Sequence, residues 1–176
     1  MQLVEYNEAW PATYLREKER LTKVLGRSAH IEHIGSTSVP GLMAKPIIDI
    51  LVGLPAAEIS QAVSALLPLG YMSYGTAGVE GRDFLRDRES SRHLHVTVFQ
   101  SQFWRDRLAF RDHLRRNAED RDLYAELKRR LSAEFACQRP LYTSGKADFI
   151  ARCIERFQTT GEERYPPTLS QAGDDR

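Results

Sequence analysis

The sequence predicts an α+β fold, with a sheet in the N-terminal half and helices in the C-terminal half. Short alternating or continuously apolar segments, which are typical of strands, occur before Gln102, and apolar residues recur at helical spacing after it. The chain has 176 residues, 41% of them hydrophobic and 28% charged. This composition predicts one compact domain, residues 1–160, followed by a flexible tail at 161–176 that lacks periodicity.

Five segments are expected to form strands: His30–Ile34, Pro46–Leu54, Tyr71–Tyr74, Arg82–Asp87 and His93–Phe99. A helix is expected before them, from Asn7 to Gly26, and another near 59–67, closed by Gly70. Three amphipathic helices are expected after the sheet. Their apolar residues are Phe103, Phe110 and Leu114, then Leu123, Leu127, Leu131 and Phe135, then Phe149, Ile150, Cys153, Ile154 and Phe157.

Charge and hydropathy exclude several classes of protein. The net charge of +1 is too small for general nucleic-acid binding, and no apolar run has the length of a membrane span. The N-terminus lacks the features of a signal peptide, so a cytoplasmic protein is expected. Cys137 and Cys153 are expected to be buried reduced thiols, since neither has a neighbour at zinc-site spacing.

The small residues Gly35, Ser36, Thr37 and Ser38 follow the first strand and form the first candidate site. Such a loop lets backbone N–H groups approach a ligand, and at a helix start these donors favour phosphate. A turn that binds nothing uses the same residue types and is the alternative.

Asp49 lies within an apolar strand and is the second candidate. A buried carboxylate stays ionised when a cation or several hydrogen bonds replace its water, and a divalent metal does this well. The alternative is an Asp that receives backbone N–H bonds at a strand end.

His93 and His95 share one face of a predicted strand and form the third candidate. Two neutral imidazoles are a common metal-binding pair, and charged ones would bind phosphate. We expect both to point into one cavity with Asp49; a half-exposed strand is the alternative. Of Glu32 and His33, which lie on opposite faces of their strand, only one can face that cavity.

The fourth candidate is a basic group made of Lys45, Arg82, Arg86, Arg88 and Arg92, in which Arg82 and Arg86 share one strand face with Phe84 between them. It suits a phosphate chain with an aromatic ring beneath a base, although a solvated edge strand is commoner. The basic residues of the later helices alternate with acids and predict exposed faces: Arg115, Arg116, Lys128, Arg129 and Arg130.

The run from Ile31 to Ile50 closely resembles the signature of the GrpB family of small bacterial proteins. Further matching residues extend the resemblance to about residue 157: Arg92 to His95, Phe110 to Asp112, Leu114, Arg115, Tyr124 to Leu131, Tyr142, Thr143, Lys146, Phe149 and Ile150. The resemblance implies a nucleotidyltransferase-like mixed sheet of about five strands, related to DNA polymerase β. Some relatives are fused to dephospho-CoA kinase, which implies a CoA-like phosphate as another possible ligand.

In that superfamily a Gly-Ser loop binds the triphosphate, while paired carboxylates on the next strand hold two metal ions. Gly35 and Ser36 match the loop and Asp49 matches the first carboxylate, but Leu51 stands at the second position. A substitute acid would have to come from Glu32, Glu80 or Asp83, and His95 would lie near the third position.

The preferred expectation is transfer of a nucleoside monophosphate from a nucleoside triphosphate to a hydroxyl of an unknown small molecule or protein. Mg²⁺ or Mn²⁺ would be bound by Asp49 with Glu32, His93 and His95, and Asp49 and His95 would be catalytic. One alternative is a catalytically inactive module that binds a nucleotide or a CoA-like phosphate. Another is a hydrolase in which His93, His95 and a carboxylate bind Zn²⁺ or Mn²⁺.

Overall fold

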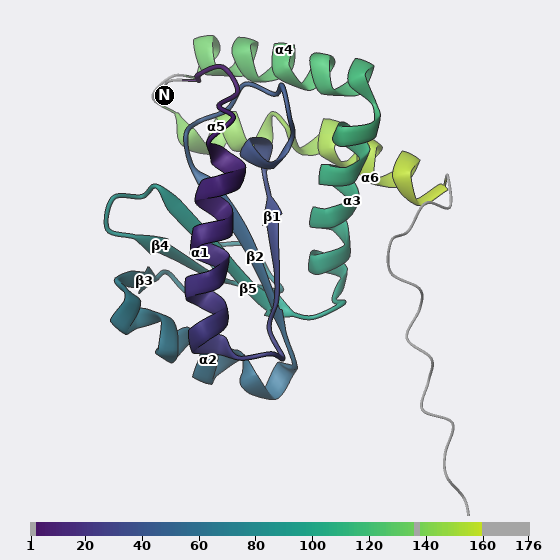
Figure 1. Cartoon of the computed structure of the whole chain (residues 1–176). Helices are drawn as coiled ribbons and strands as arrows, with labels where there is room; N and C mark the ends of the chain where they lie inside the picture. The colour runs from purple at the N-terminus through teal and green to yellow at the C-terminus, as the bar shows by residue number, and fades with distance from the viewer. Residues whose placement is uncertain (1–2, 136–137, 160–176) are drawn as a thin grey trace, which may run out of the picture.

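The computed structural model describes residues 3–135 and 138–159, and its centre is a five-stranded mixed sheet (Figure 1). The strands are β1 (His30–Ile34), β2 (Ile48–Leu54), β3 (Tyr71–Ser73), β4 (Asp83–Asp87) and β5 (Arg92–Val98). Their order across the sheet is β1-β2-β5-β4-β3. Only the central pair β2 and β5 is parallel, and the other three pairs are antiparallel. The predicted α+β fold with a mixed sheet is therefore confirmed.

Two helices, α1 (Trp10–Leu25) and α2 (Ile59–Leu66), cover one face of this sheet. The helical spacing of Trp10, Tyr14 and Leu21 places their side chains against the inward residues of β1 and β2 in the main hydrophobic core. Gly26, with φ of 78°, ends α1 as its sequence position predicts.

Helix α3 (Gln102–Arg116) covers part of the opposite face, where Trp104 and Leu108 pack on Ile34 and Leu51. Helices α4 (Ala118–Glu134), α5 (Arg139–Ser144) and α6 (Ala147–Thr159) complete the helical half. The described part of the chain thus has four helices after the sheet where three were predicted. The additional helix, α5, has only six residues and is too short to produce an apolar period.

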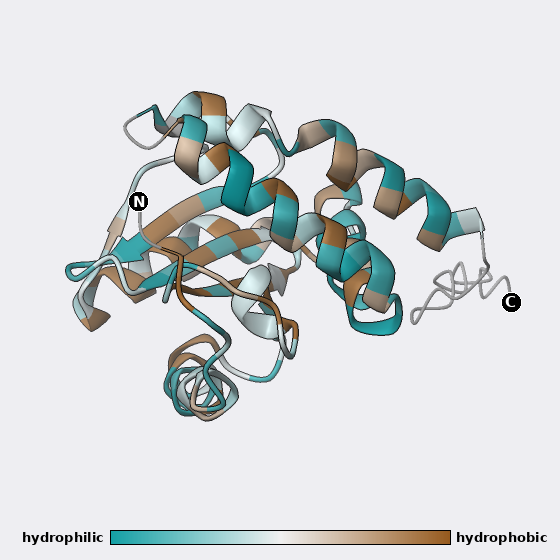
Figure 2. Cartoon of the chain, turned by 90° about the horizontal axis from the view of Figure 1, so that it is seen from above, coloured by the Kyte–Doolittle hydropathy of each residue, from teal (hydrophilic) through white to brown (hydrophobic). Residues whose placement is uncertain are grey.

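Apolar residues concentrate in the strands, whereas the helices alternate hydrophilic and hydrophobic positions along their length (Figure 2). In α4 the buried residues are Asp120, Tyr124, Lys128 and Leu131, and Leu123 is 53% exposed. The prediction that Leu123 belongs to the buried stripe is therefore wrong, because α4 packs with the face that carries Tyr124, one residue later in the helix, and not with the face that carries Leu123.

Cys137 and the predicted tail at 161–176 lie outside the described residues. Cys153 is buried and reduced, as predicted. None of the helices in residues 3–135 and 138–159 combines the length and apolar content needed to cross a bilayer.

Candidate functional site

The parallel pairing of β2 with β5 builds the centre of the candidate site. In this register Asp49 is opposite His93 and Leu51 is opposite His95, so all four side chains project from the same face of the sheet. Asp49 Oδ1 lies 3.3 Å from His93 Nδ1 and 3.4 Å from His95 Nε2. The predicted placement of both imidazoles beside the carboxylate is confirmed, whereas their binding of a metal stays a prediction.

Arg82 determines which nitrogen of His95 carries the hydrogen. Arg82 Nη1 lies 2.7 Å from His95 Nδ1, and a guanidinium can only donate, so Nδ1 accepts. The hydrogen is then on Nε2, which faces Asp49 Oδ1. Both nitrogens of His95 are engaged, so its binding to a cation requires that Arg82 move away. The pKa of His95 lies below its ordinary value. Burial and the positive charges of Arg82 and Arg107 lower this pKa, and the opposing effect of Asp49 is too small to cancel them.

The Asp49 carboxylate is ionised at neutral pH. Burial alone would raise its pKa, but hydrogen bonds from His93 and His95 outweigh this effect and hold the pKa well below its usual range. The side chain is 28% exposed, so one edge of the carboxylate remains open toward the cavity.

The small-residue loop packs directly against Asp49. Gly35 has φ of 71°, and a Cβ at this position would lie 2.5 Å from Asp49 Oδ2, so only glycine allows this approach. The loop continues as a single 3-10 turn, Ser36–Ser38. The expectation of a helix start is therefore wrong, because three residues in a 3-10 turn produce no helix macrodipole.

The hydroxyl groups of the loop have different roles. Thr37 Oγ1 donates to the Ile47 carbonyl at 3.1 Å, and Ser38 Oγ donates to the Gly35 carbonyl at 2.6 Å, so both hydroxyls hold the loop in shape. The Ser38 carbonyl in turn accepts two hydrogen bonds from Arg115, at 2.9 and 2.7 Å. The third hydroxyl, Ser36 Oγ, instead accepts a hydrogen bond from a cation that lines the cavity.

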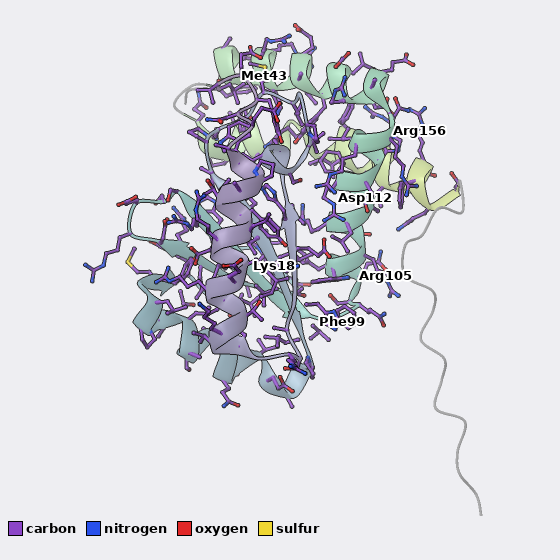
Figure 3. The ribbon with its side chains drawn as sticks, viewed as in Figure 1. Lys18, Met43, Phe99, Arg105, Asp112 and Arg156 are labelled. Atoms are coloured by element: carbon purple, nitrogen blue, oxygen red, sulfur yellow. The ribbon has the colours of Figure 1, made fainter. Side chains whose placement is uncertain are left out.

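That cation is Lys128, which reaches the loop from α4 and is only 2% exposed. Its Nζ donates to Ser36 Oγ at 3.1 Å and to the Met43 carbonyl. Met43 is labelled beside α4 in Figure 3. The same Nζ lies 5.0 Å from the Tyr124 ring centroid. Burial, followed by the charges of nearby basic residues, lowers the pKa of Lys128 to about 7.

The sequence predicts exposed helix faces for both Lys128 and Arg115; the structure corrects this for Lys128, which is buried, and confirms it for Arg115, which is exposed although its guanidinium donates to the Ser38 carbonyl. Both reach back to the loop after β1. A signal was present for Lys128, since it lies four residues after Tyr124 and three before Leu131, on the buried side of α4.

These elements enclose a cavity of about 510 Å³, a volume typical of small-molecule sites. Two guanidinium groups are held over aromatic rings: Arg82 lies 4.4 Å from the Phe84 ring centroid, and Arg86 lies 4.4 Å from that of Tyr74. The rings therefore position cations rather than offering a free face to a base. The charged residues lining the cavity are Lys45, Asp49, Arg82, Arg86, Lys128 and Lys146, together with His93 and His95.

Comparison with known proteins is consistent with this architecture. A sequence model of the family described as "GrpB protein" matches residues 1–156. The chain belongs to the GrpB family. A UPF0157 protein of Streptomyces coelicolor is 39% identical over 84% of this chain and 79% of its own length. A UPF0157 protein of Halalkalibacterium halodurans is 38% identical over 90% of this chain and 83% of its own.

Solved structures share this fold, one of them a GrpB protein and another, at much lower identity, a polymerase. The conserved protein GrpB from Enterococcus faecalis has a TM-score of 0.83 and 32% identity, covering 92% of this chain and 100% of that one. The Cid1 poly(U) polymerase has a TM-score of 0.51 at 13% identity, covering 73% of this chain but 42% of Cid1. The similarity to Cid1 concerns the fold alone.

Within residues 3–135 and 138–159 of this GrpB-family chain, no second carboxylate lines the cavity beside Asp49. Leu51 is fully buried against Trp104 and Leu108. The Glu32 carboxylate is bound by Arg111, at 2.7 Å, and does not line the cavity.

The other two nominated acids are also elsewhere. Asp83 pairs with Val96, which places it on the opposite face of the sheet, and Glu80 is exposed and does not line the cavity. Among the described residues, Asp49 is thus the only acid in the cavity lining. One carboxylate surrounded by cations does not fit a pair of magnesium ions.

Proposed function

We propose that this protein binds a nucleoside triphosphate in the cavity, with the phosphate chain against the Gly35–Ser38 loop. The observation that carries the proposal is the charge of the cavity lining, in which five basic side chains accompany a single carboxylate. Such an excess of positive charge suits a polyanionic ligand and disfavours a dication.

Lys128 gives the proposal its most specific contact. In the described part of the chain its ammonium group has two hydrogen-bond acceptors, Ser36 Oγ and the Met43 carbonyl, and both are neutral. A charge that is 2% exposed and bound only by neutral acceptors is costly, and a ligand phosphate at Ser36 would neutralise it. Arg82 and Arg86, already oriented by their aromatic contacts, would bind the remaining phosphates.

The experiment is calorimetric titration with the four common nucleoside triphosphates and with inorganic triphosphate, with and without Mg²⁺ or Mn²⁺. Lys128→Met removes the buried cation, and we expect affinity to fall about 10- to 100-fold, the equivalent of one charged hydrogen bond. Lys23→Met, on the exposed surface of α1, is the matched control and should bind as the wild type does. Equal binding by the two variants, or binding of none of the ligands by the wild type, would refute the proposal.

Nucleotidyl transfer is the second candidate, supported by the fold and by the position of Asp49 beside the loop. Its signature is pyrophosphate release from a nucleoside triphosphate with Mg²⁺ or Mn²⁺ that is lost in Asp49→Asn. Binding without turnover favours the inactive module instead. Release of phosphate that depends on Zn²⁺ or Mn²⁺ and on His93 would favour the hydrolase.

A further inference from the structure

Three helices bring three metal-binding side chains together at a point separate from the cavity. His113 comes from the last turn of α3, Asp120 from the first turn of α4 and Cys153 from α6. One ligand atom from each lies within 4.8 Å of the other two. The three residues are 8%, 5% and 2% exposed, respectively.

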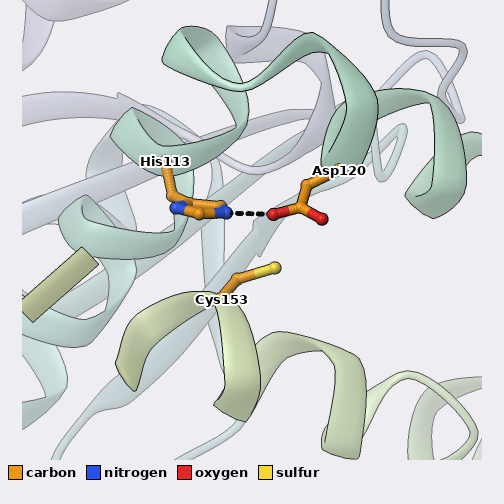
Figure 4. Close-up of side chains that lie close together, drawn as sticks. All are labelled: His113, Asp120 and Cys153. Carbon is orange, nitrogen blue, oxygen red and sulfur yellow. Dashed lines mark hydrogen bonds and ion pairs between the residues drawn. The ribbon is translucent and has the colours of Figure 1, made fainter. Parts of the chain in front are cut away.

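The corner between α3 and α4 explains how the cluster forms. Asn117 ends α3 by donating to the His113 carbonyl, and its side chain then caps α4 by accepting from the Asp120 N–H at 3.0 Å. This single residue between the helices places His113 Nε2 2.5 Å from Asp120 Oδ2. Figure 4 shows the Cys153 sulfur approaching the same pair from α6.

We propose that His113, Asp120 and Cys153 bind one Zn²⁺ ion that joins the three helices. Imidazole nitrogen, thiolate sulfur and carboxylate oxygen are the three donor types that zinc takes in proteins, whereas a thiolate does not suit Mg²⁺. On binding, the Cys153 thiol releases its proton to solvent and the Zn–S bond replaces the S–H bond, while His113 gives up the Nε2 hydrogen that it shares with Asp120 and takes the Nδ1–H tautomer, so that a Zn–N bond replaces that hydrogen bond. Water supplies the fourth ligand.

Arg156 acts as the outer partner of the zinc site. Its Nη1 lies 3.1 Å from Asp120 Oδ1 and 2.9 Å from Oδ2, and its side chain is 61% exposed, on the outer side of the helical half in Figure 3. Ligating carboxylates are usually held by such a second hydrogen-bonding group.

A nucleophilic cysteine explains the same residues less well. The imidazole nitrogen near the thiol is already bonded to Asp120, so it is not free to act as a base toward Cys153. Burial also raises the pKa of Cys153 to about 11, which keeps it a thiol in the metal-free protein.

Cobalt substitution tests the site with a spectroscopic signal. The full chain, freed of metal with a chelator, is titrated with Co²⁺, and a thiolate-to-cobalt charge-transfer band is expected at one ion per chain. Zn²⁺ should abolish this band, and Mg²⁺ should leave it unchanged. The chain has two cysteines, so Cys153→Ser should lose the band while the matched control Cys137→Ser keeps it.

Two further measurements keep the test independent of folding. Circular dichroism shows whether Cys153→Ser retains the wild-type helix content, and thermal unfolding should show a rise in Tm with Zn²⁺ for the wild type and Cys137→Ser but not for Cys153→Ser. Arg156→Gln, which keeps all three ligands, should bind Zn²⁺ about 10- to 100-fold more weakly. The proposal is overturned if the wild type gives no cobalt band, if Cys153→Ser keeps it, or if only Cys137→Ser loses it.

Discussion

Replacing Lys128 with methionine should make the protein more stable at pH 6, although it removes two hydrogen bonds. The pKa of Lys128 falls from 10.5 to about 7 on folding, mainly because the ammonium group is buried. One pH unit of displacement corresponds to about 1.4 kcal/mol, so burying the charged form costs on the order of 5 kcal/mol. Losing the bonds to Ser36 and the Met43 carbonyl costs about 1 kcal/mol each. The net gain expected at pH 6 is about 3 kcal/mol.

The pH dependence of this gain has a definite sign. Below pH 7, Lys128 is protonated in both folded and unfolded chains, so the wild type bears the whole cost of burial. Between about 7 and 10.5 the unfolded chain binds more protons than the folded one, and wild-type stability rises with pH. The advantage of Lys128→Met should therefore shrink by about 1.4 kcal/mol per pH unit above pH 7 and reverse near pH 9.

The assay is urea-induced unfolding of the wild type, Lys128→Met and the control Lys23→Met at pH values from 6 to 9. Every other titrating group is common to the first two proteins, so the difference between their free energies of unfolding reports Lys128 alone. Parallel pH profiles, with a constant difference between the two free energies of unfolding, would show that Lys128 has an ordinary pKa. That result would refute the cost that is assigned to burying its charge.

Three other substitutions test the geometry of the site. Gly35→Ala should lower the free energy of unfolding by on the order of 3 kcal/mol, because the new Cβ meets Asp49. The control is Gly26→Ala in the same urea assay: Gly26 also has a positive φ, but a Cβ there meets open space, so the substitution should cost only about 1 kcal/mol. Arg82→Met should raise the pKa of His95 in an NMR titration, because burial remains but a nearby positive charge is removed; a lower pKa would contradict the contact. Leu51→Asp should cost more than about 3 kcal/mol in thermal unfolding, because an unpaired carboxylate would be buried against Trp104, and a stable variant would show that this packing is wrong.

The strand pattern predicted the centre of the candidate site better than its surroundings. The alternation in β5 placed His93 and His95 on one face, and the parallel register brought them beside Asp49 as expected. Glu32 shares that face, yet its carboxylate binds Arg111, which is 79 residues away in the chain. Alternation determines the direction of a side chain, whereas its partner depends on how α3 packs on the sheet.

The sequence by itself determined the fold class, the five strands and the candidate residues of the loop and sheet, because strand and helix periods are local properties of the chain. Only the tertiary structure placed Lys128 at the loop, 92 residues from Ser36, and assembled the cluster of His113, Asp120 and Cys153 from three helices. The physical reason is the same in both cases. A charged or polar residue on a helix gives the same local pattern whether it faces water or a neighbouring element, and the choice depends on contacts between segments that are distant in sequence.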